Sequence, residues 1–140
     1  RDFGTAWFWF RRMAQETVVH RVDVETGRRY VTGVDEALAV DGIDEVLDWF
    51  LVHDHDEVGP NPPGRGSVLV RAGGQVWRVR LEPDGAALER GGDSGDATVS
   101  GPAGELLLWL WGRRTDDAVT IEGDAELVAA LRARLVAVTQ

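Results

Sequence analysis

The fold of this chain is decided by the stretch Ser67-Val-Leu-Val-Arg-Ala-Gly-Gly-Gln-Val-Trp-Arg-Val-Arg-Leu81. Its central Gly-Gly dipeptide is typical of a two-residue hairpin turn, so the segments on either side are predicted to pair as antiparallel strands. In the second segment Trp77, Val79 and Leu81 alternate with polar residues, which indicates a strand with one face on a core.

The segments around this hairpin predict an α+β protein. Gly42 separates two short helical stretches within 34–52, and residues 5–23 form a lone N-terminal helix. Residues 91–95 are glycine-rich and predict a flexible loop. Further strands are predicted at 86–90, 97–100 and 118–122, and further helices at 101–111 and after Asp124. We expect a lone N-terminal helix followed by a domain with an antiparallel-rich sheet and packed helices.

Composition excludes several classes of function. The 140 residues carry a formal net charge of -9, which argues against nucleic acid and anionic membranes as partners. The absence of Cys excludes disulfides, thiolate metal sites and cysteine nucleophiles. No apolar run is long enough for a membrane span and nothing resembles a signal peptide, so a cytoplasmic location is expected. The first residue is Arg1 and the single Met is Met13, which suggests a piece of a longer polypeptide or a processed product.

Glu16 and His20 are the strongest candidate metal ligands in the sequence. Their spacing of four places a carboxylate and an imidazole on one face of the N-terminal helix, with Asp23 on the same stripe. Such a pair can supply two ligands to a divalent metal ion but cannot complete a site. The other interpretation is a surface Glu, an ordinary helix His and an Asp paired with Arg21 or Arg12.

Three arginines are candidates for binding an anion. Arg78 and Arg80 project from the polar face of the second hairpin strand, and Arg113 follows the predicted helix 101–111. A solvated sheet face and a cap on the helix carbonyls are the competing interpretations.

Two further segments have an ordinary interpretation beside a functional one. The aromatic run Trp7–Phe10 is predicted to contact a missing domain or a second copy of the chain, because a small domain cannot easily bury it. The cluster His53-Asp54-His55-Asp56 lies in a segment rich in Pro and Gly, and we interpret it as a solvated acidic loop.

The segment Trp9-Phe-Arg-Arg-Met-Ala-Gln-Glu-Thr-Val-Val-His-Arg-Val-Asp23 resembles the mycothiol-dependent maleylpyruvate isomerase family. It looks like the last helix of that family's N-terminal DinB-like four-helix bundle. The resemblance implies that Glu16 and His20 bind a divalent metal, typically zinc, together with a His from an earlier helix. That earlier His has no counterpart here, and the family commonly has His where this chain has Gln15.

The remainder of the chain resembles the C-terminal domain of the same family, which is similar to sterol carrier protein 2. The strands around Trp77 carry this resemblance together with four further segments. These are Ala39-Val-Asp-Gly-Ile-Asp-Glu45, Ala97-Thr-Val-Ser-Gly-Pro102, Leu107-Leu-Trp-Leu-Trp-Gly-Arg-Arg114 and Val119-Thr-Ile-Glu-Gly-Asp124. The resemblance implies two parts: residues 1–27 as the last helix of a truncated bundle, and residues 34–140 as a sterol carrier protein 2-like domain.

Two functions follow from this resemblance. The first is the C-terminal portion of a mycothiol-dependent, metal-dependent isomerase or thiol-transferase-like protein that is inactive as this fragment. In it Asp23 would orient a ligand, and Arg78, Arg80 or Arg113 would neutralise the carboxylates of a small substrate. The missing bundle or a second copy would dock on the Trp7–Phe10 helix. The second is a non-catalytic module that binds a hydrophobic ligand or another protein.

Overall fold

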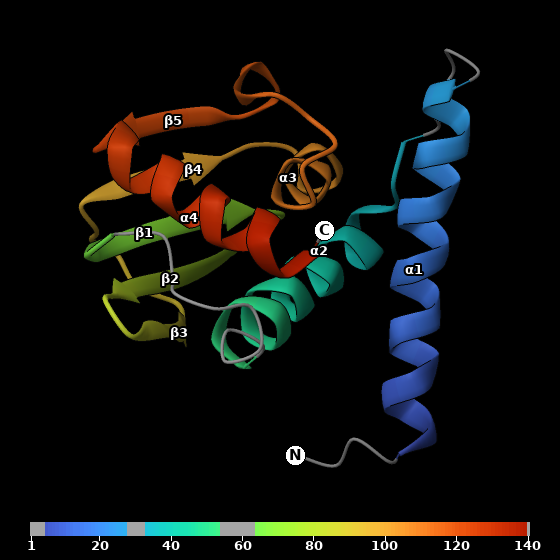
Figure 1. Cartoon of the computed structure of the whole chain (residues 1–140). Coiled ribbons are helices and arrows are strands. Elements are labelled where there is room, and N and C mark those ends of the chain that lie inside the picture. Colours follow the sequence, from blue (N-terminus) through green and yellow to red (C-terminus); the bar gives the residue numbers. More distant parts are fainter. Residues whose placement is uncertain (1–4, 28–32, 54–63, 140) are drawn as a thin grey trace.

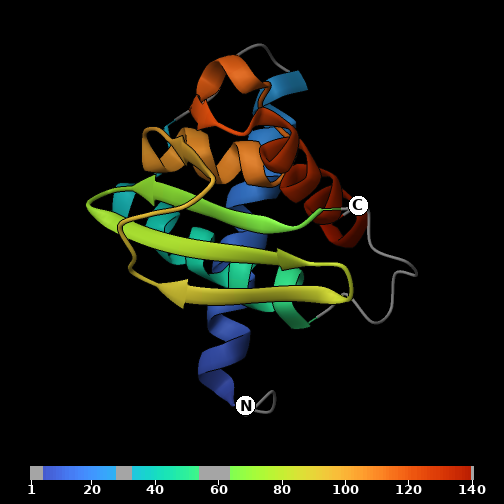
Figure 2. The same cartoon turned by 90° about the vertical axis from the view of Figure 1, so that its left-hand side faces the viewer.

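A computed structural model describes residues 5–27, 33–53 and 64–139. These residues form three layers, which Figure 1 shows: a five-stranded sheet, a middle layer of helices on one face of the sheet, and the long helix α1 (Ala6–Gly27) beyond them. In Figure 2, which views the molecule from the sheet side, α1 lies behind both other layers. The predicted α+β architecture with an N-terminal helix is confirmed.

The sheet has the strand order β3-β2-β1-β4-β5. Neighbouring strands are antiparallel, except that β1 and β4 are parallel. Gly73 and Gly74 turn between β1 and β2 with φ angles of 56° and 75°, a conformation that glycine adopts without strain. The strands are β1 (Gly66–Ala72), β2 (Gln75–Glu82), β3 (Gly85–Arg90), β4 (Ala97–Ser100) and β5 (Thr120–Gly123).

The helix α2 (Glu36–Glu45) begins after Asp35, whose side chain accepts a hydrogen bond of 3.2 Å from the Leu38 amide. It continues directly into the π-helix η1 (Val46–His53). The predicted break at Gly42 is therefore wrong: the helix runs through this residue, which serves close packing instead of termination. The remaining helices are α3 (Ala103–Leu110), η3 (Asp116–Ala118) and α4 (Ala125–Thr139). None of the helices in the described ranges is long and apolar enough to cross a membrane.

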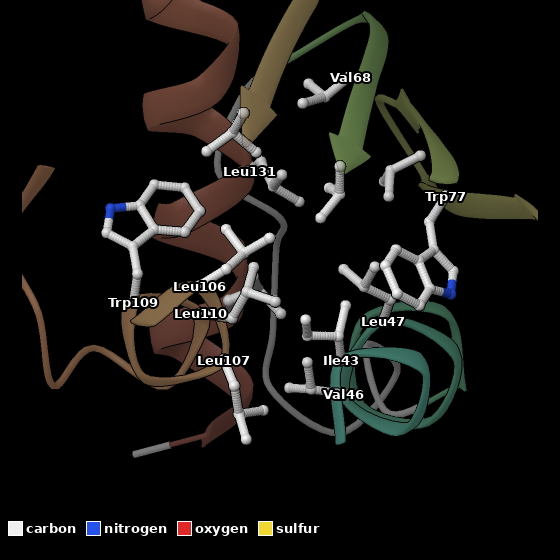
Figure 3. Packing of buried hydrophobic residues seen from close by; sticks show 14 of the residues in the cluster. Ile43, Val46, Leu47, Val68, Trp77, Leu106, Leu107, Trp109, Leu110 and Leu131 are labelled. Carbon is white, nitrogen blue, oxygen red and sulfur yellow. The ribbon is translucent and has the colours of Figure 1, made fainter. Parts of the chain in front are cut away.

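The hydrophobic core lies between the sheet and the middle helices. Trp77, Val79 and Leu81 of β2 are buried on the inner face, as their alternation predicts. Figure 3 shows Trp77 and Val68 of the sheet facing residues from α2, η1, α3 and α4. Its labelled helix residues are Ile43, Val46, Leu47, Leu106, Leu107, Trp109, Leu110 and Leu131, all of them buried.

The connection between β3 and β4 crosses the outer face of the sheet (Figure 2). The Gly91 amide donates to the Val76 carbonyl at 2.7 Å, and the Asp96 amide donates to the Ser67 carbonyl at 2.8 Å. Leu69 points to this outer face and is nevertheless buried. A Cβ on Gly95 would lie only 3.1 Å from the Ser67 carbonyl oxygen, so glycine allows the close approach. The segment predicted as a flexible loop is thus attached to the sheet at both ends.

Candidate metal centre

Glu16 and His20 lie one turn apart on α1, outside the stripe of buried residues on this helix. The Oε2 atom of Glu16 is 3.2 Å from Nε2 of His20, and their side chains are 45% and 70% exposed. Both line a shallow surface depression along the outer side of α1. The predicted juxtaposition of carboxylate and imidazole is therefore present and accessible to solvent.

The separation of these two atoms suits two ligands of one zinc ion. Bonds of about 2.0 Å at tetrahedral angles put neighbouring ligand atoms about 3.3 Å apart. The same distance also suits a direct ion pair when His20 is protonated. No group of three or more His, Cys, Asp or Glu side chains gathers within residues 5–27, 33–53 and 64–139. The geometry of the pair is compatible with two ligands of a metal ion, and the residues that the structure describes supply no third ligand beside it.

Arg12 connects Glu16 to the interior of the protein. It forms an ion pair with Oε1 of Glu16, one turn along α1, and a second one of 2.9 Å with Oε2 of Glu45 on α2. The guanidinium also lies over the Phe50 ring, 5.1 Å from its centroid. Glu45 is almost fully buried, and burial raises the pKa of its carboxyl although Arg12 opposes the shift. One oxygen of Glu16 is therefore fixed by Arg12, and the other faces His20.

A second set of polar contacts attaches α1 to α2. Arg11 donates to Asp41 at 3.0 Å and to Asp44 at 3.3 Å. The buried Gln15 amide nitrogen donates to the Leu38 carbonyl and to Asp41, both at 3.2 Å. Gln15 lies directly against Gly42, because a Cβ there would be 2.4 Å from its Oε1. These contacts attach one side of α1 to α2.

Asp44 extends the network to the sheet. It accepts hydrogen bonds from Arg90 at 2.6 and 2.9 Å and from the Trp77 indole at 3.0 Å. Burial favours its neutral form, but the bonds from Arg90 and Trp77 outweigh burial and hold the pKa of Asp44 below its ordinary value. The α1 helix is thus tied through α2 to β2 and β3.

The lowered pKa of Asp44 predicts a pH dependence of stability. Asp44 stabilises the fold above the unfolded-state pKa of about 3.9, and this contribution is lost as the pH falls further through its folded-state pKa. We expect Asp44→Asn to lower the unfolding free energy at pH 7 and to weaken its fall between about pH 4 and pH 2. Urea unfolding at several pH values measures both effects.

Glu45 provides a control of opposite sign for this prediction. Its raised pKa means that its contribution decreases as the pH rises through the folded-state value. Glu45→Gln should therefore leave the acid-side loss of stability in place. If Asp44→Asn loses stability on acidification as steeply as the wild type does, the role assigned to Asp44 is wrong.

Asp23 and Arg113 form a further contact between α1 and the rest of the chain. Arg113 donates to the two carboxylate oxygens of Asp23 at 3.0 and 3.1 Å. The hydrogen bonds from Arg113, opposed by partial burial, hold the pKa of Asp23 below its ordinary value. Of the three candidate arginines, Arg113 is therefore the one that contacts α1.

Arg78 and Arg80 lie far from the Glu16/His20 pair in the layered structure. Their strand register places them on the outer face of the sheet, opposite the middle helices, and Nη1 of Arg78 is 3.9 Å from Glu89. The structure does not bring these two arginines together with Glu16 and His20.

The aromatic run is mostly exposed. Trp7, Trp9 and Phe10 are 76%, 59% and 71% exposed, whereas Phe8 packs on Trp49 with ring centroids 4.9 Å apart. The exposed rings lie in the first turns of α1, N-terminal to Glu16 and His20 on the same helix. Of the cluster His53-Asp54-His55-Asp56, the backbone of His53 ends η1 and residues 54–56 lie outside the described residues.

The sequence interpretation missed the roles of Arg12, Gln15 and Glu45. Arg12 and Gln15 fall in the same stripe of α1 as the buried Val18, Val19 and Val22. This helical spacing is the sequence signal that could have indicated their burial. Glu45 lies on the inner side of α2, beside the buried Ile43. A buried acidic residue is paired in most proteins, so its partner had to be sought on another element.

Comparison with known proteins agrees with the predicted family. A family model described as the MDMPI C-terminal domain matches residues 37–130, which is the family that the sequence indicated. Among curated proteins, none matches the chain.

Three solved structures illustrate the fold that the chain is similar to. Sterol carrier protein 2 like 2 from Aedes aegypti is 21% identical, covers 65% of this chain and 94% of its own, and has a TM-score of 0.44. The palmitated form from the same organism is 21% identical, covers 66% of this chain and 93% of its own, and has a TM-score of 0.48. The apo form of sterol carrier protein 2 from Yarrowia lipolytica is 13% identical, covers 79% of this chain and 96% of its own, and has a TM-score of 0.47.

Proposed function

The chain belongs to the MDMPI C-terminal domain family, and on this premise we propose that it acts as the C-terminal portion of a mycothiol-dependent, metal-dependent isomerase or thiol-transferase-like protein. Glu16 and His20 supply two ligands to a divalent metal ion, with zinc as the expected metal. The observation that supports this proposal is the outward-facing Glu16/His20 pair, whose facing atoms are 3.2 Å apart. We also propose that the protein acts in the cytoplasm.

The remaining ligands come from another helix that covers the outer face of α1. Trp7, Trp9 and Phe10 provide apolar surface for this contact, since all three are exposed in the first turns of the same helix. The expected partner is the family's N-terminal bundle, and a second copy of the chain is the other candidate. Without such a partner the pair binds metal weakly.

The bound groups would cooperate in thiol chemistry. A divalent metal ion held there acts as a Lewis acid and lowers the pKa of the mycothiol thiol. Arg113 is the candidate for a small carboxylate substrate, because its contact with Asp23 places a guanidinium beside α1. The substrate carboxylate would exchange with Asp23 on Arg113, and Asp23 would otherwise help to orient the ligand His20.

A zinc titration of the chain tests the metal site. Zinc is added at pH 7.5 while the ring-proton signals of His20 are followed by NMR. We expect a saturable shift with weak affinity, its loss in His20→Ala, and an affinity about tenfold lower in Glu16→Gln because a neutral amide is a poorer ligand. Addition of the N-terminal bundle to the sample should raise the affinity to one tightly bound equivalent.

Thr17→Ala is the matched control, since Thr17 lines the same depression without contributing a ligand. Its zinc affinity should equal that of the wild type. A His20 signal that does not respond to millimolar zinc, or responds equally in Glu16→Gln, would contradict the metal proposal.

The second candidate function is a non-catalytic module that binds a hydrophobic ligand or a protein. A groove of about 530 Å³ between α4 and β5 favours it, because its lining is largely apolar. Ile121, Val128 and Val136 lie along this groove, and Arg132 borders it. Absence of zinc binding both in the chain and in its mixture with the bundle would leave this module as the better account.

A further inference from the structure

Glu45 lies behind the proposed metal ligands, on a different helix. Its Oε2 atom is 2.9 Å from Nη1 of Arg12, and Arg12 in turn holds Oε1 of Glu16. The side chains of Glu45 and Arg12 are only 4% and 11% exposed. Glu45, Arg12, Glu16 and His20 thus form a continuous chain of charged contacts from the middle layer to the surface.

Arg12 alone would oppose a cation at Glu16. A guanidinium next to a carboxylate cancels much of its charge and repels a divalent ion at short range. Glu45 supplies the compensating negative charge on the buried side of Arg12. With this compensation the set Glu45, Arg12 and Glu16 keeps one net negative charge, and Oε2 of Glu16 stays available beside His20.

We propose that Glu45 is a positioning residue for the metal site, which neutralises and holds Arg12 so that Glu16 can present Oε2 to a metal ion. This inference rests on the proposed function. It gives α2, which follows α1 in the chain, a role in a site that has two of its ligands, Glu16 and His20, on α1.

Stability alone gives a poor reason for a buried glutamate here. Buried ion pairs contribute little net stability, because the loss of hydration offsets the attraction. Oε1 of Glu45 is moreover buried without a hydrogen-bond donor in the part of the chain that the structure describes. The carboxylate is therefore better explained by what its charge does to Arg12 than by what it adds to the core.

The test is the zinc titration of the 140-residue chain carrying Glu45→Gln. We expect zinc to bind about tenfold more weakly than in the wild type, as is usual when a residue that orients a ligand is lost. The double variant Arg12→Gln/Glu45→Gln removes both charges and should bind zinc more tightly than Glu45→Gln. If Glu45→Gln fails to fold by circular dichroism, Glu45→Asp replaces it, since the shorter side chain no longer reaches Arg12.

Asp41→Asn is the matched control. It removes the same charge from the same helix and loosens α1 through Arg11, but it makes no contact with Arg12. Its zinc affinity should stay within twofold of the wild type. Equal affinities of Glu45→Gln and the wild type, or an equal loss in Asp41→Asn, would overturn the positioning role. Zinc binding that is unaffected by His20→Ala would instead overturn the metal proposal itself.

Discussion

Replacing Gly42 by alanine is expected to loosen α1 and to lower the unfolding free energy by about 2 kcal/mol. In an unobstructed helix the same change raises stability by about 1 kcal/mol. Here the new Cβ would lie 2.4 Å from Oε1 of Gln15 and 3.0 Å from Cδ1 of Leu107, so it has contacts on two sides. Gln15 cannot simply turn away, because it is buried and its amide donates to Leu38 and Asp41.

Urea unfolding and hydrogen exchange of the α1 amides measure this effect together. The amides of α1 should exchange faster in Gly42→Ala, while those of the sheet keep their order of protection. Gly27→Ala is the control, since no atom lies within 4 Å of the Cβ position at that helix end. A neutral or stabilising Gly42→Ala variant with unchanged exchange of α1 would show that the two helices are not packed so closely.

Replacing Gly123 by alanine is expected to have a still larger effect, a loss of about 3 kcal/mol. Gly123 has a φ of 82°, which a residue with a side chain adopts only with strain. Its Cβ would also lie 2.5 Å from the Asp96 carbonyl oxygen and 3.0 Å from Cα of Ala97. Both neighbours are backbone atoms, so relief requires moving β4 away from β5.

Gly74→Ala separates the two causes of this loss. Gly74 has a similar φ of 75°, but nothing lies within 4 Å of its Cβ position. Its substitution should reveal the backbone strain alone, about 1 kcal/mol. Midpoints of thermal unfolding for both variants give the comparison. Equal midpoints would mean that β4 and β5 do not meet as closely as described.

Local signals were sufficient to predict the hairpin and the positions of the strands, but not the strand order or the parallel pairing of β1 with β4. The Gly73-Gly74 turn and the alternation of Trp77, Val79 and Leu81 give strands within one or two residues of those observed, because a hairpin depends on neighbouring residues. The loop at 91–95 was predicted less well. Its attachment to Ser67 depends on residues almost thirty positions away, which no local pattern can indicate.

In the candidate site, too, contacts within one helix were predictable from the sequence and contacts between helices were not. The spacing of Glu16 and His20 predicts that they meet, since both lie on one helix face. The contact between Arg12 and Glu45 joins two helices, and neither residue stands out in composition or periodicity. Gly42 was misinterpreted for a related reason: a glycine that ends a helix and a glycine that admits a neighbouring side chain look alike in sequence.

Arg12 of α1 pairs with the buried Glu45 of α2 across the boundary that the sequence suggests, and removing one partner of a buried pair leaves an uncompensated charge. Separating α1 from α2 would leave Glu45 without Arg12 and would expose the surface of α2 at Gly42, against which Gln15 packs. We therefore expect residues 1–27 and 34–140 to unfold in one cooperative transition. An excised fragment beginning near residue 34 should then be less stable than the whole chain, because Asp41 and Glu45 would lose their arginine partners on α1.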